Sequence, residues 1–251
     1  MSDPQFGMFN EDKSFEEETL RYTKAIAEAN RLKPAFVVVT GDLVNKPSDS
    51  TQIAEYKRIS SQLSASVPLY SVPGNHDVQN MPVPSDIAAY KKNFGPDYYT
   101  FTHGSMLGIV LNSLYLQAPQ HVPEQALEQE KWLRTTLEEA AAKRYRHIIV
   151  FLHHPFFLKE EQEADQYFNI PLSTRKKYLD LFKAHGIRHI FAGHYHRNAF
   201  GKAENIEMIT TGPVGKPLGK DPSGFRIVTI KGDKLRHQYY SLDSIPSNVP
   251  F

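Results

Sequence analysis

Five short polar clusters carry the side chains in this sequence that are best suited to chemistry. They contain carboxylate, amide and imidazole groups, and because the chain has no cysteine, any bound metal must be held by oxygen and nitrogen atoms. Singly, each cluster has an ordinary alternative, since Gly-Asp pairs are common in turns and a lone His is more often structural. Together they indicate a shared site. The clusters are Asp3-Pro4-Gln5, Gly41-Asp42, Gly74-Asn75-His76-Asp77, His153-His154 and Gly193-His194-Tyr195-His196.

Four of these clusters directly follow short, mostly apolar runs that predict buried strands. The runs lie at 35–40, 69–72, 147–152 and 187–192. In an open α/β sheet, ligands bind beyond the carboxyl ends of the strands, because the loops that follow parallel strands gather at one edge. We therefore expect these clusters to converge on one site, together with the cluster near the start of the chain.

The remaining pattern predicts an α/β protein with a mixed central sheet. Apolar residues at helical spacing indicate helices at 15–32, 52–63, 124–143 and 173–185. Further strands are expected at 106–111, 208–211, 225–230 and 235–241. Alternating strands and helices followed by a strand-rich tail favour a single α/β domain over residues 1–251.

Two finer predictions concern the segment before the last expected helix. Ser173 is expected to cap the helix at 173–185. The acidic segment 155–171 is expected to form a long surface loop beside a strand end. Long loops in compact domains often carry function.

Charge and hydropathy exclude several classes of partner. The formal net charge of the 251 residues is +1, so no strong field favours nucleic acid. No apolar run approaches the roughly 20 residues that span a bilayer. The start, MSDPQFGMFNEDK, lacks the basic and apolar stretches of a signal peptide, so we expect a cytoplasmic protein without a membrane partner. The oligomeric state is left open.

The ordered clusters resemble the calcineurin-like metallophosphoesterases. The motifs of that superfamily are D-x-H, GD, GNH followed by an acid, a strand-end His and G-H-x-H, and here Gln5 stands at the His of the first motif. Further segments, among them DPQFG, LSTRKK and GHYHRNA, are similar to the calcineurin-like phosphoesterase domain-containing protein 1 subfamily, which also carries Gln there. The resemblance implies a four-layer αββα sandwich with mixed sheets.

The resemblance also implies roles for individual residues around two adjacent divalent metal ions (Mn, Fe, Zn or Mg). Asp3, Gln5 and His196 would face the first metal, Asn75, His153 and His194 would face the second, and Asp42 would bridge them. His76 would be the catalytic residue that donates to the leaving oxygen, and Asp77 would either orient it or cap a turn. Asn75, His76 and Arg197 would contact the substrate, with His154 only packing nearby.

The start of the chain departs from the superfamily pattern. The first strand that the family places ahead of its first Asp is missing or clipped here, because only Met1 and Ser2 precede Asp3. We therefore expect Asp3 to lie on a fraying terminus. We also expect Gln5 to hold its metal less strongly than a histidine would, because an amide oxygen is uncharged and less basic.

The implied function is metal-dependent hydrolysis of phosphate monoesters, with a phosphoprotein or a small phosphoester as substrate. A protein serine/threonine phosphatase is the form that the subfamily implies. The alternative is a phosphodiesterase acting on nucleotides or glycerophosphodiesters, which uses the same core. A non-catalytic scaffold is the third reading, and it is disfavoured because a scaffold has no need of His76.

Overall fold

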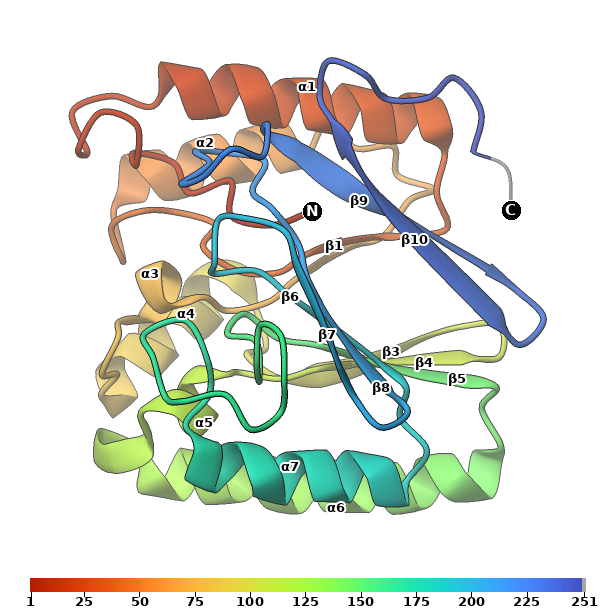
Figure 1. The fold of residues 1–251 in the computed structure, drawn as a ribbon. Coiled ribbons are helices and arrows are strands. Elements are labelled where there is room, and N and C mark those ends of the chain that lie inside the picture. Colours follow the sequence, from red (N-terminus) through yellow and green to blue (C-terminus); the bar gives the residue numbers. More distant parts are fainter. Residues whose placement is uncertain (250–251) are drawn as a thin grey trace.

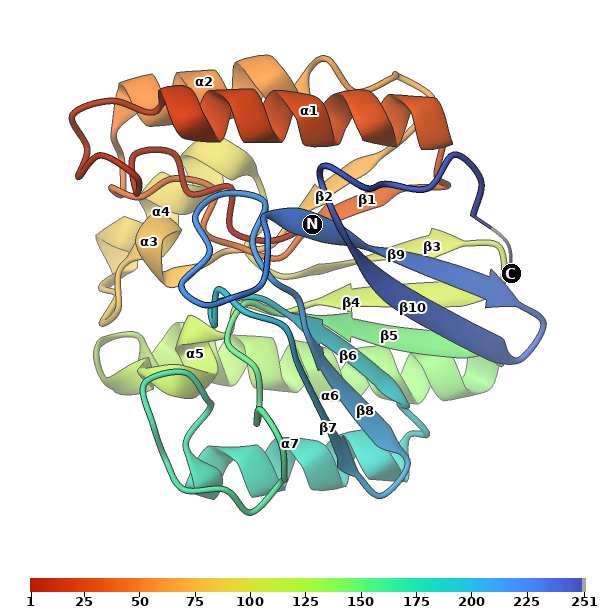
Figure 2. The ribbon, with the colours of Figure 1, turned by 45° about the horizontal axis from the view of Figure 1, so that its top comes forward.

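Two layers of strands lie between two layers of helices in the computed structural model, which describes residues 1–249 (Figures 1 and 2). Helices α1 and α2 cover one side, and α6 and α7 cover the other. The predicted four-layer sandwich is therefore confirmed. Among residues 1–249, the helices are α1 (Glu16–Leu32), α2 (Ser50–Ser60), α3 (Asn75–Val78), α4 (Pro84–Phe94), α5 (Leu114–Gln117), α6 (Pro123–Lys143) and α7 (Leu172–Ala184), with a 3-10 turn η1 at Pro119–His121.

The larger sheet of the described chain has six strands in the order β3-β4-β5-β6-β8-β7. Its middle pairs are parallel, and β3 and β7 are added antiparallel at the two edges, so the sheet is mixed as predicted. The parallel strands send their carboxyl ends to one edge. The strands are β3 (Tyr99–His103), β4 (Met106–Val110), β5 (His147–Phe151), β6 (His189–Ala192), β7 (Ala199–Ala203) and β8 (Ile206–Thr210).

The second strand layer of the described chain consists of two two-stranded sheets. Parallel strands β1 (Val37–Val39) and β2 (Leu69–Ser71) form one, and antiparallel strands β9 (Gly224–Lys231) and β10 (Lys234–Ser241) form the other. Val38 packs with Phe101 and Phe191 in the apolar layer between the sheets. A largely apolar cavity of about 590 Å³ lies where β1 and β9 face each other.

The start of the chain is firmly held, contrary to the expected fraying of Asp3. The Met1 amino group donates to Val38 O at 2.9 Å, and the Thr40 amide donates to Met1 O at 3.0 Å. Asp3 N then donates to Gly41 O, and Phe6 forms a parallel bridge with Val44. Asp3 is therefore fully buried, although no strand precedes it among the described elements. Main-chain bonds to β1 and to the residues that follow it anchor Asp3.

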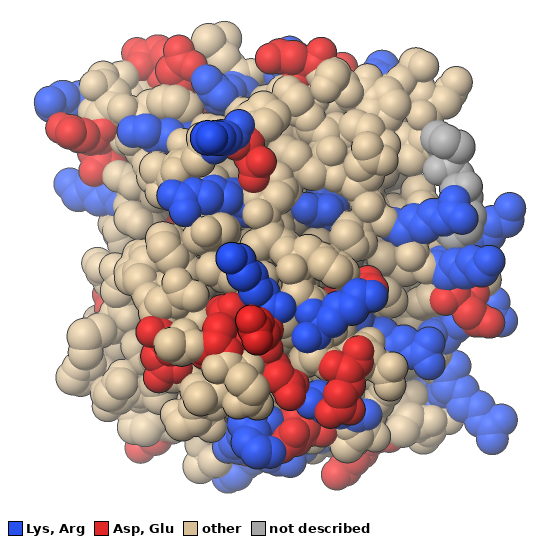
Figure 3. Space-filling model, in the orientation of Figure 1, with Lys and Arg blue, Asp and Glu red and all other residues tan. Residues whose placement is uncertain are grey.

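Some predicted elements differ from the observed ones. The last long helix begins at Leu172 with Pro171 as its cap residue, so Ser173 lies inside the helix and the predicted Ser173 cap is wrong. Helix α4 and strands β3 and β7 were not predicted. Within residues 1–249, no helix combines the length and apolar character needed to cross a membrane. Acidic and basic side chains are interspersed on the face shown in Figure 3.

Candidate metal centre

The polar clusters meet where four strands end. Asp42 follows β1, Asn75 opens α3 after β2, and His153 follows β5. His194 and His196 follow β6, which lies beside β5 in the larger sheet. All five side chains are nearly or fully buried. The convergence follows from the parallel pairing, because neighbouring parallel strands deliver their following loops to the same edge.

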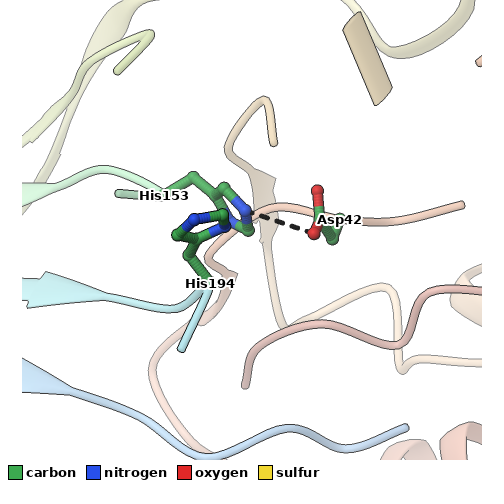
Figure 4. A group of neighbouring side chains, drawn as sticks. All are labelled: Asp42, His153 and His194. Atoms are coloured by element: carbon green, nitrogen blue, oxygen red, sulfur yellow. Dashed lines mark ion pairs between the residues drawn. The ribbon is translucent and has the colours of Figure 1, made fainter. Parts of the chain in front are cut away.

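Two groups of side chains in the described chain can each hold a metal ion, and they share one residue. The first contains Asp3, Asp42 and His196, and the second contains Asp42, His153 and His194 (Figure 4). Within each group, one ligand atom from every residue lies within 4.8 Å of the others. Asp42 thus belongs to both, which is the arrangement required of a carboxylate that bridges two cations.

The two amide side chains predicted as ligands, those of Gln5 and Asn75, are also buried at these clusters. Gln5 donates through Nε2 to Asn45 Oδ1 at 2.9 Å, while its buried Oε1 has no hydrogen-bond partner. A buried acceptor without a partner is costly, and a cation beside it would remove that cost. Asn75 Oδ1 lies 2.9 Å from His153 Nε2, inside the second group. The residues present therefore fit two cations.

Main-chain carbonyl groups fix the orientation of all three histidine rings. Thr40 O accepts from His153 Nδ1 at 2.8 Å, which turns His153 Nε2 toward Asp42 Oδ2 at 3.2 Å. Lys216 O accepts from His196 Nδ1 at 2.7 Å. Tyr167 O accepts from His194 Nε2 at 3.2 Å, which leaves Nδ1 of that ring for a metal. Such partners fix the tautomer and position of a ligand histidine.

Burial and the charges of neighbouring side chains shift the pKa values of the candidate metal ligands. Burial raises the pKa of Asp3. Burial also acts to raise the pKa of Asp42, but the neighbouring histidines, His153 foremost, together outweigh it and lower that pKa. Burial favours the neutral form of His153, but Asp42 raises its pKa to about 9. Burial and the nearby His153 lower the pKa of His194 to about 3, so this ring is neutral and available as a ligand. A cation would replace the proton that His153 and Asp42 share.

The backbone at these positions is unusual. Asp3, Gln5, Asp42, His194 and His196 all have positive φ, between 38° and 67°. Residues other than glycine rarely adopt a positive φ. Because five residues of the polar clusters do so, the backbone here points to a functional site. Glycines precede two of these residues because space is short. A Cβ on Gly41 would clash with the His153 ring, and one on Gly193 would clash with Ser2 and Asp3.

His76 lies beside the two groups and is oriented from the main chain. Its amide donates to Asp42 Oδ1 at 2.9 Å, and Asn45 O accepts from its Nδ1 at 2.8 Å, so neither bond uses Nε2. Asp77 is a turn cap, because its carboxylate accepts from the amides of Leu43, Val44 and Gly74 rather than from His76. The sequence did not reveal Asn45, because its contribution is a carbonyl group that any residue has.

Two other predicted neighbours have clear contacts. The Arg197 guanidinium donates to Leu218 O and to the Tyr195 hydroxyl, so in this conformation it supports the loop that holds Lys216. His154 is buried, with Nδ1 2.8 Å from Ser113 Oγ and its ring centroid 4.1 Å from that of His194. His154 thus packs against a candidate ligand.

We expect Gln5 to make the first metal site the weaker of the two. Manganese titration calorimetry should resolve two affinities, because an amide oxygen is a poorer donor than an imidazole nitrogen. Gln5→His should tighten the weaker site and Gln5→Ala should loosen it, each by about tenfold. Two equal affinities that neither substitution moves would show that Gln5 is not a ligand.

Comparison with known proteins agrees with this geometry. A family model described as calcineurin-like phosphoesterase matches residues 2–198. Serine/threonine-protein phosphatase CPPED1 of Bos taurus is 37% identical, over 97% of this chain and 83% of that protein. A probable cyclic nucleotide phosphodiesterase of Fibrobacter succinogenes is 29% identical, over 70% of this chain and 63% of that protein. A solved dimetal phosphatase from Danio rerio shares the fold, with a TM-score of 0.69 at 15% identity over 96% of this chain and 95% of that one.

The family match covers more than half of the chain and includes every cluster that meets at the candidate centre. The resemblance inferred from the motifs is therefore confirmed. This chain belongs to the calcineurin-like phosphoesterase family and is a phosphoric ester hydrolase.

Proposed function

We propose that this protein hydrolyses phosphate monoesters, such as phosphoserine or phosphothreonine in proteins, at a centre of two divalent metal ions. The observation that carries the proposal is the pair of buried ligand groups that share Asp42. The name of the bovine relative supports the substrate class. The proposed ligands are Asp3, Gln5, Asp42 and His196 for the first ion, and Asp42, Asn75, His153 and His194 for the second.

The chemistry divides between the ions and the protein. When bound, two cations supply the positive charge that clamps phosphoryl oxygens and acidifies an attacking water. The chain contributes fixed geometry, since main-chain carbonyl groups hold the His153, His194 and His196 rings before substrate arrives. The mixed oxygen and nitrogen donors suit Mn, Fe, Zn or Mg.

His76 is the proposed proton donor to the leaving oxygen. Asn45 O accepts the Nδ1 proton in either charge state of the ring, which leaves Nε2 to carry the proton that is transferred. In this role His76 contacts the substrate and no metal.

Phosphodiester hydrolysis is the second candidate, because the phosphodiesterase relative from Fibrobacter succinogenes is similar over most of this chain. The two reactions use the same ligands and differ in what the surrounding loops admit. A scaffold function is not supported, because the chain retains both ligand groups and His76.

Chelation and substrate choice test the proposal together. We expect the manganese-loaded protein to turn over phenyl phosphate, and exhaustive chelation to lower the rate by at least about a hundredfold, because the cations supply several kcal/mol of charge stabilisation. Readdition of Mn²⁺ should restore the rate. Undiminished turnover after chelation would refute the metal mechanism, and faster turnover of bis(phenyl) phosphate would establish the second candidate instead.

A further inference from the structure

One residue of the acidic loop at 155–171 reaches two candidate ligands of the second metal. The carbonyl oxygen of Tyr167 accepts from His194 Nε2 at 3.2 Å. Its side-chain hydroxyl accepts from Asn75 Nδ2 at 3.5 Å, and its ring centroid lies 4.9 Å from that of His194. Tyr167 therefore lies directly beside the place where the second ion would bind.

The Tyr167 side chain is open to solvent on its other side. The residue is 56% exposed, whereas Asn75 and His194 are 2% and 3% exposed. The phenol thus stands between the buried ligands and the surface from which a substrate must enter. The Tyr167 hydroxyl accepts a hydrogen bond from Asn75. Among residues 1–249, no acceptor is found for the proton of this hydroxyl.

The loop that carries Tyr167 is held by the buried guanidinium group of one arginine. Arg175 is fully buried in α7 and donates to Ile170 O through Nε and Nη2, and to Glu161 O and Glu163 O through Nη1. Asn169 adds a bond to the Glu163 carboxylate at 2.8 Å. These bonds span both sides of Tyr167 along the chain, so its position is set before substrate binds.

We propose that the Tyr167 hydroxyl donates a hydrogen bond to a phosphoryl oxygen of the bound ester, which makes Tyr167 a substrate-binding residue. The inference rests on the proposed hydrolysis of phosphoesters at this centre. A neutral donor suits the position, because it binds an anionic oxygen without adding a positive charge that would repel the cations. The carbonyl contact to His194 is independent of the side chain, so the two roles of Tyr167 can be separated by substitution.

Tyr167→Phe removes the hydroxyl and leaves the ring and the carbonyl in place. We expect kcat/KM for phenyl phosphate to fall about ten- to a hundredfold, the usual effect of losing a hydrogen bond to a charged group. The affinity of the manganese-loaded protein for inorganic phosphate, measured by calorimetry, should fall by a similar factor. Metal content should not change, because Tyr167 O still holds His194. Tyr240→Phe, on β10, is the matched control and should change none of these values.

The phosphate-binding measurement separates this inference from the proposed function. If the native protein binds phosphate and Tyr167→Phe binds it more weakly, the inference stands even where neither protein hydrolyses phenyl phosphate, and only the proposed function falls. If native turnover is observed and the variant matches it in kcat/KM and in phosphate affinity, the inference falls and the function stands. Loss of metal from Tyr167→Phe would also overturn the inference, since the hydroxyl would then serve the ligands. A native protein that binds no phosphate when loaded with metal would overturn both.

Discussion

His76→Ala should lower kcat for phenyl phosphate by about 10²–10⁴ while both metal ions remain bound, because it removes a general acid and no ligand. The structure separates these two effects. Both metal-binding groups form without His76, whose Nδ1 is engaged by Asn45 O, while its amide bond to Asp42 does not depend on the side chain. The measurement is steady-state kinetics paired with elemental analysis of the same preparation.

The leaving group gives this experiment a second readout. A variant that lacks the proton donor should lose least on esters whose leaving oxygen is already acidic, so 4-nitrophenyl phosphate should be affected less than phenyl phosphate. His103→Ala, at an exposed position on β3, is the control for loss of a histidine and should behave like the native protein. Loss of metal along with activity would instead identify His76 as a ligand.

The sequence predicted the strand ends well because four of the five polar clusters follow a mostly apolar run. Val37–Val39 and His147–Phe151 are short and rich in β-branched residues, and such runs are typical of buried parallel strands. The position of Asp42 and His153 then follows from sheet geometry. At β1 and β5 the apolar pattern of the sequence and the observed sheet agree, so the pattern alone was enough to predict both strands.

Prediction failed where a contact distant in sequence sets the structure. Asp3 was expected to fray because nothing in its neighbours along the chain anchors it, but bonds to Gly41 and pairing of Met1 with β1 bury it. Ser173 has the chemistry of a cap, but the helix begins at Leu172, whose amide donates to Asp165 Oδ1. The sequence alone identifies neither Gly41 as the partner of Asp3 nor Asp165 as the partner of Leu172.

The groups that orient the histidine rings could not be predicted from the sequence either. The acceptors that orient His76, His153 and His194 are carbonyl oxygens of Asn45, Thr40 and Tyr167. A carbonyl group carries no signature in residue type. The one available signal was the length and acidity of the 155–171 segment, which pointed to a functional loop and does contain Tyr167.

Replacing each of two adjacent buried histidines should have very different consequences for metal. His153 Nε2 lies 2.9 Å from Asn75 Oδ1 and 3.2 Å from Asp42 Oδ2, at the centre of the second group. His154 instead bonds to Ser113 and packs against the His194 ring at a tilt. His153→Ala should therefore weaken the second metal by more than about a hundredfold, and His154→Ala by no more than about tenfold, the lower end of the effect of a supporting contact.

The pair forms its own control, because both residues are buried histidines and only His153 belongs to a candidate metal-binding group. They are 0% and 2% exposed, so alanine removes an imidazole ring from the interior in both cases. Both substitutions should lower the free energy of unfolding by about 1–3 kcal/mol through loss of packing. A difference in metal affinity, measured by calorimetry below the melting temperature of both variants, then reports ligation rather than damage to the fold. The opposite ranking would make His154 the ligand, and it would require the loop after β5 to rotate so that His154 leaves Ser113 and faces Asp42.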